Sequence, residues 1–329
     1  MATSAEKFIE DGKSFTENKL KSLSQKIEGL QSIKPIEKLC IYVTGSYGRL
    51  EASPFSDIDL FFVHDGSEKN NGIPYATKEL LDKDIIRLIE EMGFPEFTND
   101  AEHLTVHYID DICQRLGSPD DDYKNFFTAR LLLLLESRPV CHSNFYAEFV
   151  RKIIESYYRD YQDHKENFRP TFLINDIIRY WRTLCLNYEY KRNDPPMIEE
   201  ENNKARLKRL KLKFSRLLTC FPAVLLLVSS QDVVTPDNLM KIVKMTPVER
   251  LDRASGSIAG AKEIVLRMKD QYCWFLEQTG RNREKVLEWI SDRDHRKDAF
   301  KKGDRFGDAM FELLKIGTGK TDKLRYLVV

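Results

Sequence analysis

The sequence lacks any cysteine spacing typical of a disulfide framework or a zinc site. Its six cysteines are scattered, and no Cys-x-x-Cys motif or Cys/His cluster occurs among them. This distribution favours reduced, buried thiols and excludes small disulfide-stabilised or zinc-ribbon folds. We therefore expect a chain without disulfides.

The sequence also lacks an excess of charge and a long apolar run. Lys and Arg together number 52, as do Asp and Glu, which argues against general attraction to nucleic acid or to anionic membranes. The longest apolar run, residues 221–228, is too short to cross a bilayer, and residues 1–38 do not resemble a signal peptide. These features predict a cytoplasmic protein without a membrane partner.

What the sequence does contain is enough apolar material for two domains in 329 residues, of which 42% are hydrophobic. Helical periodicity predicts an N-terminal helical segment over residues 1–36 and a helical domain over 123–329. Between them, residues 37–122 combine short apolar runs with one amphipathic helix. The expected fold class is α+β, a small mixed-sheet domain followed by a helical bundle.

One motif stands out in the middle segment. An apolar, β-rich run over residues 39–43 leads into Gly45-Ser46-Tyr47-Gly48-Arg49, and Ser56-Asp57-Ile58-Asp59-Leu60 opens a second strand. Because side chains alternate along a strand, Asp57 and Asp59 share one face while Ile58 and Leu60 point into the core. Two carboxylates this close repel each other unless a cation lies between them, and such ligands suit Mg²⁺. The small Gly-Ser turn leaves room for a triphosphate.

This pattern resembles the nucleotidyltransferase superfamily of the polymerase β type, whose signature is Gly-Ser followed about ten residues later by Asp-x-Asp. The variant present here looks closest to the bacterial nitrogen-regulatory uridylyltransferase and the nucleotidyltransferases related to it, and residues 128–138 resemble a leucine-rich helix of those proteins. The resemblance implies that Gly45 and Ser46 bind the nucleotide and that Asp57 and Asp59 hold Mg²⁺, with Mn²⁺ as an alternative ion.

Most members of that superfamily have a third carboxylate on the next strand. The corresponding β-like segment, residues 103–108, offers Glu102 at its start and Asp110 and Asp111 beyond its end. We take Glu102 as the candidate base, although His107 occupies a place where an acid is expected. His103 and His107 are interpreted as core or edge histidines.

Further cations come from the helical domain. Arg179 and Arg182 share a helix face and are candidates for triphosphate binding, with Lys213 and Arg216 on the next basic helix as a second pair. The alternative is an internal ion-pair network with Asp176, and for the run 204–216 a solvated helix face.

Two residues of the signature turn have open roles. Tyr47 either stacks on a base or covers the strand, and Arg49 either touches phosphate or anchors the loop at Glu51.

The sequence thus predicts transfer of a nucleoside monophosphate from a nucleoside triphosphate to a hydroxyl of a protein, an RNA or a small molecule, with release of pyrophosphate. A nucleotide-sensing or partner-binding module that has lost catalysis is the second hypothesis. An RNA-binding adaptor is the third.

Overall fold

The computed structural model describes residues 4–95, 104–191, 198–319 and 327. The chain groups into two compact units, one formed by Ile9–Arg159 and the other by Asp160–Val329 together with Met1–Phe8. Helix α1 (Ser4–Glu28) contributes to both units. Each unit is described separately below.

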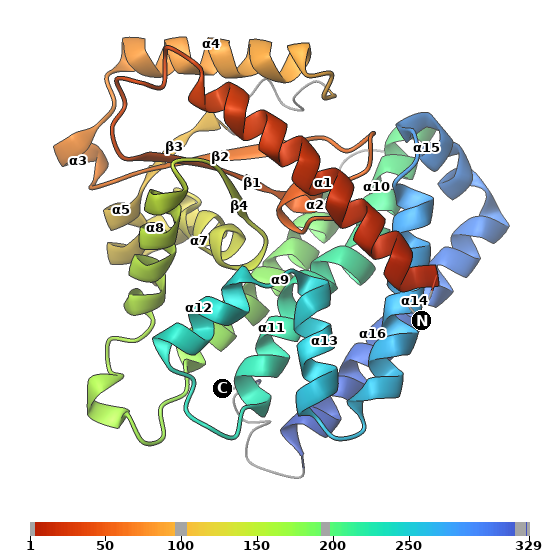
Figure 1. The fold of residues 1–329 in the computed structure, drawn as a ribbon. Helices are drawn as coiled ribbons and strands as arrows, with labels where there is room; N and C mark the ends of the chain where they lie inside the picture. Colours follow the sequence, from red (N-terminus) through yellow and green to blue (C-terminus); the bar gives the residue numbers. More distant parts are fainter. Residues whose placement is uncertain (1–3, 96–103, 192–197, 320–326, 328–329) are drawn as a thin grey trace. The chain divides into compact units, whose positions relative to one another are not determined.

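The first unit contains the sheet (Figure 1). Its strands are β1 (Leu39–Thr44), β2 (Asp59–His64), β3 (Val106–Tyr108) and β4 (Arg138–Cys141). Its helices after α1 are α2 (Gly45–Gly48), α3 (Glu68–Asn71), α4 (Tyr75–Glu91), α5 (Ile109–Gln114), α6 (Pro119–Tyr123), α7 (Phe126–Leu135) and α8 (Ser143–Ser156).

The four strands form a mixed sheet in the order β3-β2-β1-β4. Strand β1 is antiparallel to both β2 and β4, and β2 is parallel to β3. In the β1–β2 register, Thr44 lies opposite Asp59. The last residue of β1 and the first residue of β2 therefore meet at one end of the sheet, where the chain enters α2.

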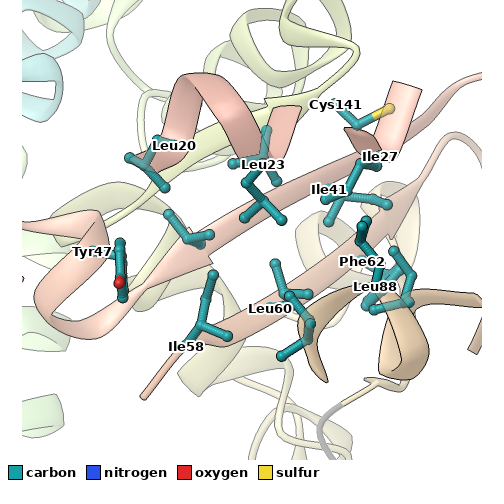
Figure 2. Packing of buried hydrophobic residues seen from close by; sticks show 14 of the residues in the cluster. Leu20, Leu23, Ile27, Ile41, Tyr47, Ile58, Leu60, Phe62, Leu88 and Cys141 are labelled. Atoms are coloured by element: carbon teal, nitrogen blue, oxygen red, sulfur yellow. The ribbon is translucent and has the colours of Figure 1, made fainter. Parts of the chain in front are cut away.

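One face of the sheet carries the hydrophobic core of this unit. The alternating side chains of β1 and β2 pack there against α1 and α4 (Figure 2). The core residues include Ile41, Leu60, Phe62, Leu23 of α1 and Leu88 of α4. Burial of this apolar face is what fixes the register, because a slip of one residue would turn every strand side chain to the opposite face.

The other face of the sheet is aromatic and lies against α7 and α8. Tyr42 stacks on Phe61 at 5.6 Å between ring centroids and meets Tyr146 of α8 edge-on at 6.4 Å. His107 stacks on Phe61 and meets Phe126 of α7 edge-on. Because Asp59 alternates with Leu60 along β2, its side chain belongs to this second face.

The second unit is helical. It contains η2 (Gln162–His164), α9 (Thr171–Lys191), α10 (Glu199–Lys211), η3 (Leu212–Arg216), α11 (Leu217–Ser229), α12 (Pro236–Lys244), α13 (Pro247–Ser257), α14 (Ala261–Thr279), α15 (Arg283–Ser291) and α16 (Arg293–Thr318). Helices α10 and α11 are continuous through η3, which is a π-helical turn.

The run Glu199–Ser229 is long and apolar enough to cross a membrane by length and composition, but 72% of its apolar window is buried within the protein. A buried core helix has the same composition as a membrane span, so the run by itself is weak support for a membrane location.

The predicted α+β class, a small mixed sheet with a helical C-terminal region, is confirmed. The division between the compact units falls after Arg159, whereas the sequence places the start of the helical domain at residue 123. Residues 138–141 explain the difference, because they form β4 and pair with β1. A four-residue strand that contains Pro139 has too little periodicity to be recognised from sequence.

Candidate active site

The signature turn forms a single helical turn, α2, directly at the end of β1. The turn closes with backbone hydrogen bonds from Arg49 N–H to the Gly45 carbonyl and from Glu51 N–H to the Ser46 carbonyl. Gly45 is buried, and Ser46 is half-buried. The predicted small turn is thus present, and it is compact with defined hydrogen bonds.

Gly45 lies against the carboxylate of Asp59. Its φ is +66°, a backbone conformation that side chains with a Cβ rarely adopt. A Cβ built on Gly45 would lie 2.9 Å from Oδ2 of Asp59. Two independent constraints, backbone conformation and space, therefore require glycine at this position and bring the turn into contact with the strand carboxylate.

The two carboxylates of the motif lie at the same end of the sheet. Asp59 is the first residue of β2 and is half-buried, while Asp57 lies just before the strand and is exposed. Ile58 between them is 3% exposed and Leu60 is fully buried, both in the core cluster. The predicted inward direction of Ile58 and Leu60 is thus confirmed, and the carboxylates are left on the other side.

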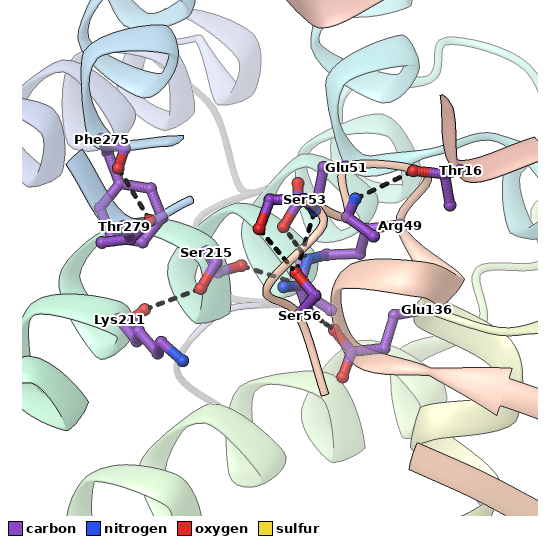
Figure 3. A network of polar contacts seen from close by, with 12 residues as sticks. Thr16, Arg49, Glu51, Ser53, Ser56, Glu136, Lys211, Ser215, Phe275 and Thr279 are labelled. Atoms are coloured by element: carbon purple, nitrogen blue, oxygen red, sulfur yellow. Dashed lines mark hydrogen bonds and ion pairs between the residues drawn. The ribbon is translucent and has the colours of Figure 1, made fainter. Parts of the chain in front are cut away.

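Arg49 is held by two carboxylates. Its Nε donates to Glu51 at 2.6 Å and its Nη1 donates to Glu136 at 2.5 Å, with all three side chains 8% exposed or less (Figure 3). The guanidinium of Arg49 is thus buried in an ion-pair network inside the protein, and phosphate binding by Arg49 stays a prediction. Of the two roles considered, the anchor at Glu51 is the one that the contacts support.

The second glycine of the turn, Gly48, has no room for a side chain. A Cβ on Gly48 would lie 1.9 Å from the backbone oxygen of Glu136. Glu136, the residue that directly follows α7, therefore contacts the signature turn through both its backbone and its carboxylate. The sequence analysis missed Glu136 as a partner of the turn, although an acid that closes an apolar leucine run is a signal that could have found it.

The Tyr47 side chain belongs to the core. It is 2% exposed and meets Phe94 edge-on at 5.6 Å between ring centroids. Burial, and secondarily the negative charge of Asp57, raises the pKa of Tyr47 to about 12. A ring in this position covers the strand, which is one of the two predicted roles, and nucleotide binding by Tyr47 stays a prediction.

The described part of β3 supplies no third carboxylate. His107 points to the same face as Phe61, and its burial lowers its pKa to about 4, so the ring is a neutral core residue. Asp110 and Asp111 follow β3 and contact Gly66 and Glu68, which follow the far end of β2. Five residues of strand separate that end from Asp59, roughly 16 Å at the usual rise. These two acids therefore do not complete the site.

Glu102 and His103 lie outside the described residues. Within the described ranges, no group of three or more His, Cys, Asp or Glu side chains is arranged to hold a metal ion. The donor set at this end of the sheet is thus Asp57 and Asp59. Carboxylate oxygens beside an uncrowded glycine turn fit a hard cation that also binds phosphate oxygens.

Among the basic side chains predicted to bind triphosphate, Arg179 and Lys213 make ion pairs within the helical unit. Arg179 lies 3.7 Å from Asp176, as the internal-network alternative expects, and Arg182 is exposed on the same helix. Lys213 pairs with Asp304 of α16 at 2.5 Å. Arg216 is half-buried. Nucleotide binding by these four residues stays a prediction.

The basic run of α10 is likewise engaged locally. Lys204 pairs with Glu200 one turn earlier, and the guanidinium of Arg209 lies 4.9 Å above the ring of Phe300. Such contacts are typical of a solvated helix face.

Comparison with known protein families agrees with the position of this site. Residues 23–130 match the nucleotidyltransferase domain family. The match includes α1 from residue 23, the signature turn, both carboxylates and β3, and it ends within α7.

The nucleotidyltransferase domain match covers about a third of the chain and leaves the helical unit outside it. No curated protein sequence matches the chain. The narrower resemblance to the nitrogen-regulatory uridylyltransferase therefore stays a prediction.

Proposed function

We propose that this protein is a Mg²⁺-dependent nucleotidyltransferase that moves a nucleoside monophosphate from a nucleoside triphosphate to a hydroxyl acceptor. The observation that carries the proposal is the contact between Gly45 and the Asp59 carboxylate at the end of the sheet. It places a turn without side-chain bulk directly beside a metal-type ligand. The family match of residues 23–130 supports the same chemistry.

In this proposal Asp57 and Asp59 hold the metal ion, and Ser46 with the backbone of Gly45 and Tyr47 holds the outer phosphates. When bound, Mg²⁺ supplies charge neutralisation on the phosphate oxygens. The acceptor oxygen forms a bond to the α-phosphorus while the bond from that phosphorus to the bridging oxygen breaks, and pyrophosphate leaves. The hydroxyl proton passes to a carboxylate, for which Glu102 is the candidate from the sequence.

The surrounding contacts give this site rigidity. Buried ion pairs from Arg49 to Glu51 and Glu136 hold the turn in place. The backbone of Gly48 also packs on that of Glu136. Because phosphoryl transfer depends mainly on positioning and charge, a turn fixed by buried ion pairs supports such a reaction. The acceptor in this proposal is a hydroxyl group of a protein, an RNA or a small molecule.

The test is the double substitution Asp57→Ala with Asp59→Ala. We expect loss of label transfer from α-labelled ATP, UTP, GTP and CTP to acceptors in cell extract, and loss of Mn²⁺ binding measured by electron paramagnetic resonance. The melting temperature should hold or rise slightly, because two mutually repelling carboxylates are removed.

The matched control is Asp110→Ala with Asp111→Ala, a second pair of acids on the same unit. This control should keep both transfer and Mn²⁺ binding. Transfer that survives the Asp57 and Asp59 substitutions would overturn the assignment, and unfolding would show that the two acids are structural.

A nucleotide-binding module without catalysis is the second candidate, favoured by one observation. The described residues include no third carboxylate beside Asp57 and Asp59. In that case the wild-type protein binds triphosphate in a manner that depends on Asp57 and Asp59, yet labels no acceptor with any of the four nucleotides.

A further inference from the structure

Residues 49–56, called the connecting segment below, join the signature turn to Asp57. The segment forms neither helix nor strand, so no regular ladder fixes its path. Asp59 differs in this respect, because it belongs to β2 and lies opposite Thr44 of β1 in the sheet. Asp57 lies outside the sheet, and its position relative to the turn therefore depends on the hydrogen bonds of the connecting segment.

Every backbone N–H group of the connecting segment donates a hydrogen bond. The first three N–H groups donate back to carbonyls of the signature turn, at Gly45, Ser46 and Tyr47. The N–H groups of residues 53, 55 and 56 donate to oxygen atoms of Ser53 and Ser56 within the segment. Within residues 49–56, only the N–H of Ala52 donates to a different element of the fold.

Thr16 of α1 accepts that remaining bond inside the protein. Its Oγ1 accepts from the Ala52 N–H at 3.0 Å and donates to the Gly12 carbonyl at 2.7 Å (Figure 3). Thr16 is fully buried and Ala52 is 4% exposed, so water does not replace this contact. A buried N–H without a partner is costly, and a hydroxyl at residue 16 is therefore needed to hold the connecting segment against α1.

The connecting segment also contains a strained residue, Leu50. Its φ is +59°, a conformation that is rare for a bulky side chain. The Leu50 side chain is buried in the core cluster of the sheet unit. Strained backbone of this kind persists only where the surrounding contacts hold it, and it occurs preferentially near functional sites. The bond from Ala52 to Thr16, two residues further along, is one of the contacts that hold it.

We propose that Thr16 is a positioning residue for the metal site and acts on Asp57 through Ala52 and the connecting segment. Without the Thr16 hydroxyl the segment is released from α1, and Asp57 loses its fixed place beside the turn. Asp59 keeps its place through the pairing of β1 with β2. This inference rests on the proposed function, because it takes Asp57 as a metal ligand.

The contact comes from outside the region that the family match covers. Thr16 precedes the matched residues 23–130, whereas Ala52 and Asp57 lie within them. All of these residues belong to the same compact unit. The N-terminal helix thus adds to the nucleotidyltransferase domain a contact that the family match does not include.

The test compares Mn²⁺ binding by the full chain, measured by electron paramagnetic resonance, in wild type, Thr16→Val and Thr16→Ser. Valine has nearly the shape of threonine but cannot accept the Ala52 N–H, and it should raise the Kd for Mn²⁺ about three- to tenfold. Serine keeps the hydroxyl and should return the Kd close to the wild-type value.

Hydrogen exchange gives a second readout that needs no metal. Peptides covering residues 49–57 should exchange faster in Thr16→Val than in wild type, because the segment has lost its bond to α1. Peptides covering β1 should keep their wild-type rates. Wild-type exchange rates over residues 49–57 in the folded variant would contradict the inference.

Thr219→Val is the matched control for general loss of stability. Thr219 is also fully buried, and its hydroxyl donates to the Ser215 carbonyl one turn earlier, as that of Thr16 does to Gly12. Thr219 lies in α11 of the helical unit. We expect this control to lower the melting temperature and to leave the Kd for Mn²⁺ unchanged, whereas an equal rise in Kd would make the effect of Thr16 a general one and overturn the inference.

The remaining outcomes separate this inference from the proposed function. If wild type binds Mn²⁺ through Asp57 and Asp59 but Thr16→Val binds it equally well, the positioning role alone is wrong. Weaker binding that Thr16→Ser does not restore has the same meaning. If wild type binds no Mn²⁺, the proposed function fails and this inference fails with it. Should Thr16→Val not fold, Thr16→Ala removes the same hydroxyl with less bulk, and the same comparison applies.

Discussion

Gly45 combines a left-handed backbone conformation with contact to a carboxylate. A side chain at this position would therefore have two separate costs, backbone strain and displacement of the carboxylate, and these can be measured separately. Gly93 also has positive φ, +71°, but a Cβ there would meet nothing within 4 Å. We expect Gly93→Ala to lower stability by about 1–2 kcal/mol through backbone strain alone. Gly45→Ala should cost more than this and should also weaken Mn²⁺ binding, because the methyl group displaces the Asp59 carboxylate.

The measurements are urea unfolding and metal titration of both variants. Equal losses of stability with unchanged Mn²⁺ affinity would show that the contact between Gly45 and Asp59 is not important.

His107 makes a residue-scale prediction about pH. Burial lowers its pKa in the folded protein to about 4, against an ordinary histidine pKa of 6.5. Between these two values the unfolded chain binds the proton more readily, so the contribution of a neutral His107 is complete above about pH 6.5 and is lost as the pH falls towards 4. The total loss should reach about 3 kcal/mol.

His107→Phe keeps an aromatic ring between Phe61 and Phe126 and removes this titration. The difference in unfolding free energy between wild type and variant should therefore change with pH in that window. His295→Gln, at a histidine whose side chain is 63% exposed, serves as the control. A constant difference from pH 7.5 to 4.5 would contradict the burial argument.

At the scale of the element, the signature turn depends on a buried ion pair to α7. Arg49→Met would leave the carboxylates of Glu51 and Glu136 buried together without their partner, which should cost about 3–5 kcal/mol. Glu136→Gln should cost less, since Arg49 keeps Glu51 and the amide keeps an acceptor. Arg267→Ala breaks an exposed pair with Glu312 and should cost less than about 1 kcal/mol.

Urea unfolding ranks these three variants, and triphosphate titration of the folded protein separates the two roles of Arg49. If Arg49→Met is as stable as wild type but binds triphosphate poorly, then Arg49 contacts phosphate after all.

At the scale of the whole molecule, the open question is whether the helical unit contributes to triphosphate binding. If Arg182 reaches the phosphates, Arg182→Ala should lose roughly 1.5–3 kcal/mol of triphosphate affinity and little affinity for the nucleoside. The loss should exceed that from Lys204→Ala, whose side chain pairs with Glu200 on its own helix.

A scaffold role predicts a lower melting temperature with unchanged affinity. Measuring melting and titration on one preparation of Arg182→Ala decides between the two roles. The same comparison with Arg179→Ala tests the neighbour that already contacts Asp176.

Local patterns in the sequence were sufficient to predict the secondary-structure elements around the site. Alternation over residues 58–60 predicted which side chains are buried, because a strand with one apolar face has only one register that buries it. The turn between β1 and β2 was predicted from Gly45 and Ser46, and the helices of the second unit from their apolar periodicity. The strand β4 was missed because four residues with a proline carry no period.

What the sequence by itself determined is the motif: a strand that leads into a glycine turn, and two carboxylates at the start of the next strand, all set by neighbours along the chain. Only the tertiary structure decided which residues the side chains of Tyr47 and Arg49 contact. The aromatic ring of Tyr47 contacts Phe94, and the guanidinium of Arg49 pairs with Glu136, which lies 87 residues further along the chain. Pairings at such separation depend on which elements pack together, and that is a property of the whole core that local spacing does not encode.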